Sequence, residues 1–555
     1  MKFDDILSKI GGFGTYQKLL ILAFIIYFPG VSWLLISVNF IAGDMDHWCK
    51  LDVNGVNKSY LKELVIPKTI DAFQKKTYSK CEMHDINITE LNAPKGDLNM
   101  TEYMLMKNWT RVPCKYGWNY DQTVFYSTIV SRYTLVCDRA RLQAVLTTFF
   151  VLGTCFGAIP SGYMSDRWGR KWTLLSLLIS KMVCNIVGAF SPYFWLFVGF
   201  RFLVGILGMG TYSVFYVILI ESMPPVRRNH CTYYVTLGRI LEFILPVIAY
   251  FVRSHTHLLL VGSGVAIPGL VCAIILPESP RWLLSRKRYK EYEKVVHKIA
   301  RINNAAFPDE ILRIERQIED NDNNATDTAS FLDLSRTPRL RKRTLILWFL
   351  WFSMTFVMYA FATNIGHLIP GSIYLNMILI IAGSEIPTFI TMWIALFKSG
   401  RRLNMIVYML ICGLCCLLMI LLIMVNMQLL VTIAAMIAMS AVNTLTRIVS
   451  LYTGEIYPTP ARTIGFGSAT GAGGVAAVIA TQILLLRHIW FGLPYVLLCV
   501  FPIVSGVLAY FLPETIGIHL PETFEEAEKF GTPEYKENLK NGSVQLKEPF
   551  IREST

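Results

Sequence analysis

The chain has 555 residues, and 54% of them are hydrophobic while only 16% are charged; its mean hydropathy is +0.45. Soluble domains carry about 25% charged residues, so this composition excludes an ordinary water-soluble enzyme. The formal charge of +13 would suit a nucleic-acid partner only if the basic residues were gathered in a soluble domain. No such domain is visible, so no nucleic-acid partner is expected.

The hydrophobic residues fall into nearly uncharged blocks of about 20, the length of a helix that crosses a hydrocarbon core of about 30 Å. The sequence therefore predicts an all-α membrane protein embedded in the lipid bilayer. Twelve transmembrane helices are expected at 18–42, 142–163, 172–190, 194–220, 231–251, 257–276, 344–363, 373–396, 404–425, 428–451, 464–486 and 493–512. The resulting segments are an N-terminus (1–17), helix 1 (18–42), a loop (44–140), helices 2–6 (142–276), a linker (277–343), helices 7–12 (344–512) and a tail (513–555).

Lys and Arg in the short loops indicate the orientation, because basic residues favour the cytoplasmic side. The loops after helices 3, 5, 7, 9 and 11 hold only Arg253 and Arg487. The loops after helices 2, 4, 8 and 10 hold nine basic residues: Arg167, Arg170, Lys171, Arg227, Arg228, Lys398, Arg401, Arg402 and Arg462. Both termini and the linker are therefore predicted to be cytoplasmic, with the protein in the plasma membrane.

The loop 44–140 is then predicted to lie outside the cell. It contains four glycosylation sequons, at Asn57, Asn87, Asn99 and Asn108, and four cysteines, Cys49, Cys81, Cys114 and Cys137. Two disulfides are expected, with three connectivities open. The other eight cysteines lie in or near the predicted spans, where core packing is their expected role, and neither a metal nor a cofactor is expected.

Two short motifs recur across the halves of the sequence. Gly169-Arg170-Lys171 returns as Gly400-Arg401-Arg402, 231 residues later. A Glu followed by an Arg seven residues later occurs at Glu221 and Arg228 and again at Glu455 and Arg462, 234 residues on. Two motifs at nearly the same offset indicate a duplicated six-helix unit. Parallel six-helix repeats are typical of secondary transporters that work by alternating access.

The repeated charges also suggest a gate. Arg170 could pair with Glu221, and Arg401 with Glu455, when the cytoplasmic side is shut, and separate when it opens. Asp166 would strengthen the first copy, since Phe397 stands at the equivalent position of the second. The alternative is that these charges only anchor helix ends at the lipid headgroups.

Further motifs are spread along nearly the whole chain: Cys114-Lys-Tyr-Gly-Trp118-Asn-Tyr120, Asp166-Arg-Trp-Gly-Arg170, Pro277-Glu-Ser-Pro-Arg281, Tyr452-Thr-Gly-Glu455 and Leu512-Pro-Glu-Thr515. With them the sequence resembles the major facilitator superfamily, and within it the organic cation, anion and carnitine transporter family of solute carriers. The resemblance implies two six-helix halves around a central site for a small organic ion. It does not fix which ion.

A charged side chain inside a span is costly, so each one is a candidate for substrate contact or for a structural pair. Arg239 and Glu242 stand three apart and could neutralise each other, or could hold a carboxylate and an amine of a substrate. Arg447 has no acid within one turn, so an anionic substrate group is a candidate partner. Glu385 matches an acidic position that is widespread in the resembled family and is either structural or a cation attractor.

Aromatic rings attract protonated and quaternary amines. The resemblance places Trp351 and Tyr359 at the central site, with Tyr212 and Tyr216 as additions, although a helical aromatic stripe can also be simple packing. At two positions where relatives distinguish anions from cations, this chain has Ala472 and Phe389 and so supports neither simple preference.

The predicted function is secondary transport of a small organic cation or zwitterion, such as a carnitine-like compound, a betaine or a beta-amino acid. An organic anion transporter is the alternative, and a non-transporting receptor of the same fold a more distant one. A coupling ion, sodium or proton, is left open. No nucleotide-binding loop or catalytic triad occurs, so no enzymatic activity is expected.

Overall fold

A computed structural model gives the arrangement of the chain. It describes residues 12–50, 66–70, 76–85, 110–224, 237–305, 334, 337–368, 371–397, 399–425, 427–458, 461–483, 486, 490, 492–515, 521 and 524–532.

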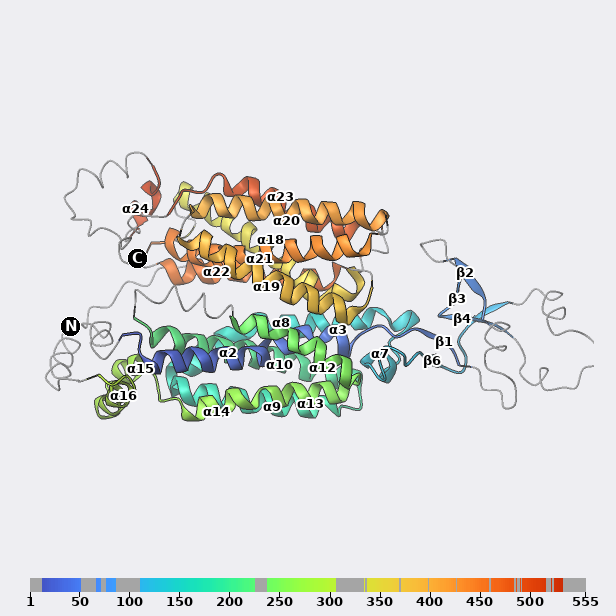
Figure 1. The fold of residues 1–555 in the computed structure, drawn as a ribbon, viewed down its shortest axis with the longest axis horizontal. Coiled ribbons are helices and arrows are strands. Elements are labelled where there is room, and N and C mark those ends of the chain that lie inside the picture. Colours follow the sequence, from blue (N-terminus) through green and yellow to red (C-terminus); the bar gives the residue numbers. More distant parts are fainter. Residues whose placement is uncertain are drawn as a thin grey trace, which may run out of the picture.

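The long helices form two layers, one from each half of the sequence (Figure 1). The first half contains α2 (Thr15–Ile36), α3 (Val38–Ile41), α7 (Ile129–Arg132), a 3-10 turn (Cys137–Arg139), α8 (Arg141–Trp168), α9 (Arg170–Ala189), α10 (Phe194–Glu221), a second 3-10 turn (Leu241–Phe243), α12 (Ile244–Val252), α13 (His255–Val265) and α14 (Ile267–Ile275). The second half contains α18 (Pro338–Leu368), α19 (Ile373–Phe397), α20 (Arg401–Met424), α21 (Gln428–Ile456), α22 (Arg462–Thr481) and α23 (Leu493–Ala509). Short helices α15 (Pro280–Ser285) and α16 (Tyr289–Ile302) lie beside the first-half layer at one end of the bundle, and α24 (Phe524–Lys529) lies beside the second-half layer at the same end.

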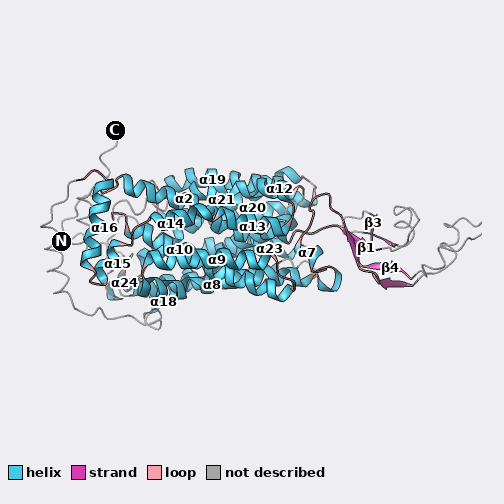
Figure 2. Ribbon diagram, turned by 90° about the horizontal axis from the view of Figure 1, so that it is seen from below, coloured by secondary structure: helices cyan, strands magenta, loops and turns pink. Residues whose placement is uncertain are grey.

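Six short strands lie at the opposite end of the bundle, hereafter the strand end (Figure 2). They are β1 (His47–Cys49), β2 (Lys68–Ile70), β3 (Lys76–Tyr78), β4 (Glu82–His84), β5 (Arg111–Pro113) and β6 (Trp118–Tyr120), and they pair antiparallel as β1–β6, β2–β3 and β4–β5. Disulfides join Cys49 to Cys114 and Cys81 to Cys137, one of the three predicted connectivities. The four sequons lie outside the described residues.

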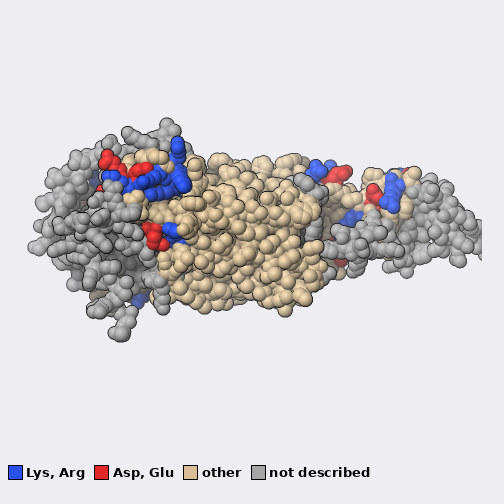
Figure 3. Space-filling model, turned by 90° about the horizontal axis from the view of Figure 1, so that it is seen from above, with Lys and Arg blue, Asp and Glu red and all other residues tan. Residues whose placement is uncertain are grey.

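Ten helices of the described residues are long and apolar enough to cross a membrane, and Leu493–Ala509 is a shorter apolar helix. The predicted fifth span begins outside the described residues, which contain its later part from residue 237 to Val252. On the face shown in Figure 3, the charged side chains lie at the two ends and an uncharged belt separates them. This distribution is the one that a bilayer requires, because charged side chains avoid the hydrocarbon core. The count of twelve spans stays a prediction.

Helices α8 and α10 touch through their backbones. A Cβ atom added at Gly153 would fall on the carbonyl oxygen of Phe202, and one at Gly205 would fall on that of Phe150. Small residues at a helix interface permit this close approach, which in a membrane is stabilised by van der Waals contact. The two helices therefore form one tightly packed pair within the first half.

The two halves are joined by polar contacts on the strand side of the bundle. The hydroxyls of Thr148 in α8 and Thr481 in α22 lie 2.8 Å apart. Closer to the middle, the Cys155 thiol donates to the carbonyl of Gly474 at 3.5 Å. Both contacts link α8 to α22, so this helix pair is a direct connection between the halves.

Candidate substrate site

Four charged side chains from both halves meet near the middle of the bundle. The Nε atom of Arg239 lies 3.1 Å from Oε1 of Glu385 and 3.7 Å from Oε1 of Glu242. Arg447 interacts electrostatically with both Arg239 and Glu385. These residues, Arg239, Glu242, Glu385 and Arg447, form the central cluster, whose two positive and two negative formal charges balance. The Arg239–Glu385 pair crosses from the first half to the second.

Breaks in the helices lie beside both carboxylates. The helical segment that carries Arg239 tightens into the 3-10 turn Leu241–Phe243, which contains Glu242, before α12 begins. In α19, Pro387 lacks the N–H that would bond the carbonyl of Gly383, so the ladder of hydrogen bonds is interrupted around Glu385. Such irregular turns are frequent at functional positions in helices.

Three of the predicted aromatic residues border the central cluster. The rings of Tyr212 and Tyr216 in α10 are stacked, with centroids 5.9 Å apart and an interplanar angle of 12°. Both interact electrostatically with Arg447, and Tyr359 of α18 does so with Arg239. The cluster thus combines charges of both signs with ring faces that can attract an amine.

Trp351 is held elsewhere. Its indole N–H donates to the Thr453 hydroxyl at 3.0 Å, and its ring lies edge-on to Phe466 with centroids 5.8 Å apart. The side chain is only 9% exposed. These contacts place Trp351 in the packing of α18, α21 and α22, apart from Tyr359, with which the sequence pattern groups it.

Asn443 belongs to the site and is not among the predicted residues. Its side-chain amide donates to Oε1 of Glu385 at 2.8 Å, the same oxygen that faces Arg239. An uncharged amide is less costly to bury than a charge, so Asn443 does not stand out in its span as the ionisable residues do. Its spacing of four from Arg447 puts both on one face of α21 and is the signal that could have found it.

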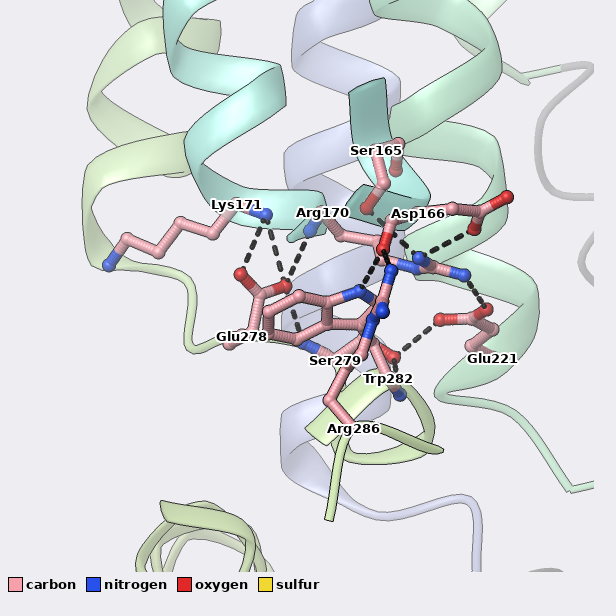
Figure 4. Close-up of polar contacts among 9 residues, drawn as sticks. All are labelled: Ser165, Asp166, Arg170, Lys171, Glu221, Glu278, Ser279, Trp282 and Arg286. Carbon is pink, nitrogen blue, oxygen red and sulfur yellow. Dashed lines mark hydrogen bonds and ion pairs between the residues drawn. The ribbon is translucent and has the colours of Figure 1, made fainter. Parts of the chain in front are cut away.

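The basic motif of the first half forms an ion cluster at the α15 end of the bundle (Figure 4). The Arg170 guanidinium lies 2.8 Å from Oδ1 of Asp166 and 3.2 Å from Oε1 of Glu221. Glu278 accepts from the backbone N–H groups of Arg170 at 2.8 Å and Lys171 at 3.1 Å. Because these N–H groups begin α9 and have no partner within the helix, Glu278 acts as its cap. Asp166, Arg170, Glu221 and Glu278 are the first-half ion cluster.

The helix α15 braces this cluster. The hydroxyl of Ser279, which precedes α15, donates to Glu221. The indole N–H of Trp282 donates to the Asp166 carbonyl at 2.8 Å, and the Arg286 guanidinium donates to the same oxygen at 2.7 Å. The chain that leaves the first half is therefore tied back to the ends of α8 and α10.

The second half repeats the arrangement. Arg401 forms an ion pair with Glu455. Glu514 accepts from the backbone N–H groups of Arg401 at 2.9 Å and Arg402 at 3.1 Å, and so caps α20. Arg401, Glu455 and Glu514 are the second-half ion cluster. The caps Glu278 and Glu514 were not predicted, although Pro277-Glu278-Ser279 and Pro513-Glu514-Thr515 repeat 236 residues apart.

Both predicted Arg–Glu pairs are thus in contact, but each lies within one half. Neither pair bridges the halves, so a gating role would act through the geometry of each half. Arg228 lies outside the described residues. Arg462 begins α22, and its side chain is not described.

Part of the tail docks on the start of α18 as α24. Glu528 accepts from the backbone N–H groups of Arg339 at 3.1 Å and Leu340 at 3.2 Å. Burial alone would raise the pKa of the Glu528 carboxyl, but hydrogen bonds from Thr337 and these N–H groups, with the charge of Arg343, lower that pKa below its ordinary value. The carboxylate is therefore charged at neutral pH, as a helix cap requires.

Comparison with known proteins gives three findings. Residues 106–527 match the family model described as "Sugar (and other) transporter". The chain is 31% identical to solute carrier family 22 member 3 of Rattus norvegicus, over 96% of each chain, and 29% identical to the beta-alanine transporter of Drosophila melanogaster, over 95% of this chain and 89% of that one. The inward-open xylose transporter XylE of E. coli has the same fold, with a TM-score of 0.56 and 16% identity over 71% of this chain and 90% of that one.

Proposed function

Because the chain belongs to the sugar (and other) transporter family and, within it, to solute carrier family 22, we propose that it carries a small organic cation or zwitterion across the plasma membrane by alternating access. Its relatives include a beta-alanine transporter of Drosophila melanogaster and an organic cation transporter of Caenorhabditis elegans, which supports this choice. The strand end faces outside in this proposal, with the loop glycosylated, and both termini are cytoplasmic.

The central cluster carries the proposal. A substrate ammonium would bind Glu385, which is 2% exposed and has Oε2 without a hydrogen-bond partner among the described residues. A substrate carboxylate would bind Arg447, whose Nε likewise lacks a hydrogen-bond partner within the described part of the chain. Since the groups come from both halves, binding there would bias the position of one half relative to the other.

The charge balance favours a zwitterion. The cluster is already neutral, so a zwitterion leaves its net charge unchanged, whereas a monocation adds a buried positive charge that needs compensation. A net-neutral substrate gains nothing from the membrane potential, while each positive charge gains about 2.3 kcal/mol per 100 mV. Concentrative uptake of a zwitterion would therefore require a coupling ion, sodium or proton.

The test is uptake of radiolabelled tetraethylammonium, carnitine, beta-alanine and a dicarboxylate by cells that express the wild type, Glu385→Gln or Arg447→Gln. We expect zwitterion uptake in the wild type, loss of amine uptake in Glu385→Gln, and selective loss of carboxylate-bearing substrates in Arg447→Gln. Surface labelling checks that each variant reaches the membrane.

Lys181→Gln is the matched control, because Lys181 is also a buried cation of a span but lies over the Tyr27 ring in the first half, at 5.6 Å. It should leave the substrate profile unchanged. Uptake of the dicarboxylate alone would favour the organic anion alternative. Binding without uptake in proteoliposomes would favour the receptor.

A further inference from the structure

The position proposed for a substrate amine is already occupied by a cation of the protein. Oε1 of Glu385 faces Arg239 Nε at 3.1 Å and accepts from Asn443 at 2.8 Å. A carboxylate that is 2% exposed is costly without such partners. A substrate ammonium that binds Glu385 must therefore compete with the Arg239 guanidinium.

Arg239 has a second carboxylate within reach. Glu242 lies three residues later, and its Oε1 is 3.7 Å from Arg239 Nε. Glu242 belongs to the same half as Arg239, whereas Glu385 belongs to the other half. The long side chain of Arg239 is 19% exposed and lies between these two acceptors, one within its half and one across the interface.

We propose that Arg239 is a tethered competitor that occupies the cation position at Glu385 in the absence of substrate, and that Glu242 receives it when a substrate ammonium binds. This rests on the proposed function and extends it to specificity. In the exchange each carboxylate faces one cation, because Glu385 takes the substrate ammonium and Glu242 takes the guanidinium of Arg239.

The exchange distinguishes two classes of substrate. A zwitterion brings a carboxylate of its own, which Arg447 or the displaced Arg239 can bind. A monocation brings none, so its binding depends wholly on Glu242 to compensate Arg239. Arg239 is therefore a specificity-determining residue that disfavours monocations, and Glu242 limits how strongly it does so.

The test compares KM values for tetraethylammonium and beta-alanine in the wild type, Arg239→Gln, Glu242→Gln and the double variant. We expect Arg239→Gln to lower the KM for tetraethylammonium about tenfold and to raise that for beta-alanine. Glu242→Gln should raise the KM for tetraethylammonium about tenfold. The double variant should resemble Arg239→Gln alone, because Glu242 acts only through Arg239.

A purely structural ion pair would give a different pattern, in which both single variants impair uptake of both probes. That result, or an unchanged KM for tetraethylammonium in Arg239→Gln, overturns the inference while leaving the proposed function intact. If the wild type transports neither probe, the proposed function and this inference both fall. If Arg239→Gln does not reach the surface, Glu242→Gln alone tests the inference. An unchanged KM for tetraethylammonium in Glu242→Gln then overturns it.

Discussion

The two ion clusters share a plan but differ in how firmly they are held. In each half an Arg pairs with a Glu at the end of a long helix, and a second Glu caps the helix that the Arg begins. Among the described residues, the first half adds the Asp166 carboxylate and the helix α15, whose Trp282 and Arg286 donate to the Asp166 carbonyl. The second half adds a hydrogen bond from Arg401 to the Thr515 hydroxyl at 3.4 Å. The duplicated unit has thus kept its ion pair and its cap, and the first half has the larger additional support.

The glycines that precede the two Arg residues show the same difference. Gly169 has a φ of +102°, a conformation that residues with a side chain rarely adopt, and Gly400 has an ordinary φ of −59°. A Cβ at either position would meet the capping carboxylate, at 2.5 Å from Glu278 or 2.8 Å from Glu514. Gly169 is therefore favoured both by its positive φ and by the nearby Glu278 carboxylate, whereas Gly400 is favoured only by the nearby Glu514 carboxylate.

The largest expected effect comes from removing the guanidinium. Arg170→Met should destabilise the protein by about 3 kcal/mol, because it leaves the Glu221 carboxylate partly buried and unpaired. Arg401→Met should cost less, since Arg401 lacks an equivalent of Asp166. Thermal unfolding of the detergent-solubilised variants measures both. Arg167→Met, which alters an exposed neighbour, is the control, and an equal loss in the two halves would contradict the comparison.

An intermediate effect is expected at the glycines. Gly169→Ala should lower stability by about 2 kcal/mol, because its φ of +102° and ψ of 155° lie in a region that is essentially restricted to glycine; the contact with Glu278 adds to this. Gly400→Ala should cost less, because the end of the Glu514 side chain can move aside. The same unfolding measurement compares them, and a larger loss in Gly400→Ala would show that the caps differ in rigidity.

The smallest effect is expected at Asp166, whose side chain is 71% exposed. Asp166→Asn should cost at most about 0.5 kcal/mol, as for other exposed ion pairs. The reciprocal change, Phe397→Asp, places a carboxylate four residues before Arg401 and should gain a similar amount. High salt should reduce both effects. Salt-independent changes would mean that the acid acts through packing rather than charge.

Much of the fold could be predicted because the bilayer imposes a strong constraint on the sequence. Uncharged blocks of about 20 residues translate directly into spans. The repeat of the Arg170 and Glu221 motifs predicts two similar halves, and the structure has them. The Glu278 and Glu514 caps depend on contacts between segments more than 100 residues apart in sequence, which hydropathy does not encode.

The central cluster was predictable residue by residue but not in its pairing. Burial cost identifies Arg239, Glu242, Glu385 and Arg447 as candidates, because each is ionisable within a span. Whether Arg239 pairs along its own helix or across the halves depends on how the halves meet. The structure shows both contacts, the one across the halves being shorter, and adds Asn443. The indole N–H of Trp351 bonds to Thr453, and the role of its ring at the central site stays a prediction.

The glycine contacts between α8 and α10 have a mechanical consequence. Because the backbones of α8 and α10 are in contact at Gly153 and Gly205, the two helices have little room to slide past each other and form one rigid unit. Tyr212 lies on α10, whereas Thr148, which contacts the second half, lies on α8. A shift of α10 at Tyr212 would therefore carry α8 with it and so be felt at the Thr148 contact with the other half.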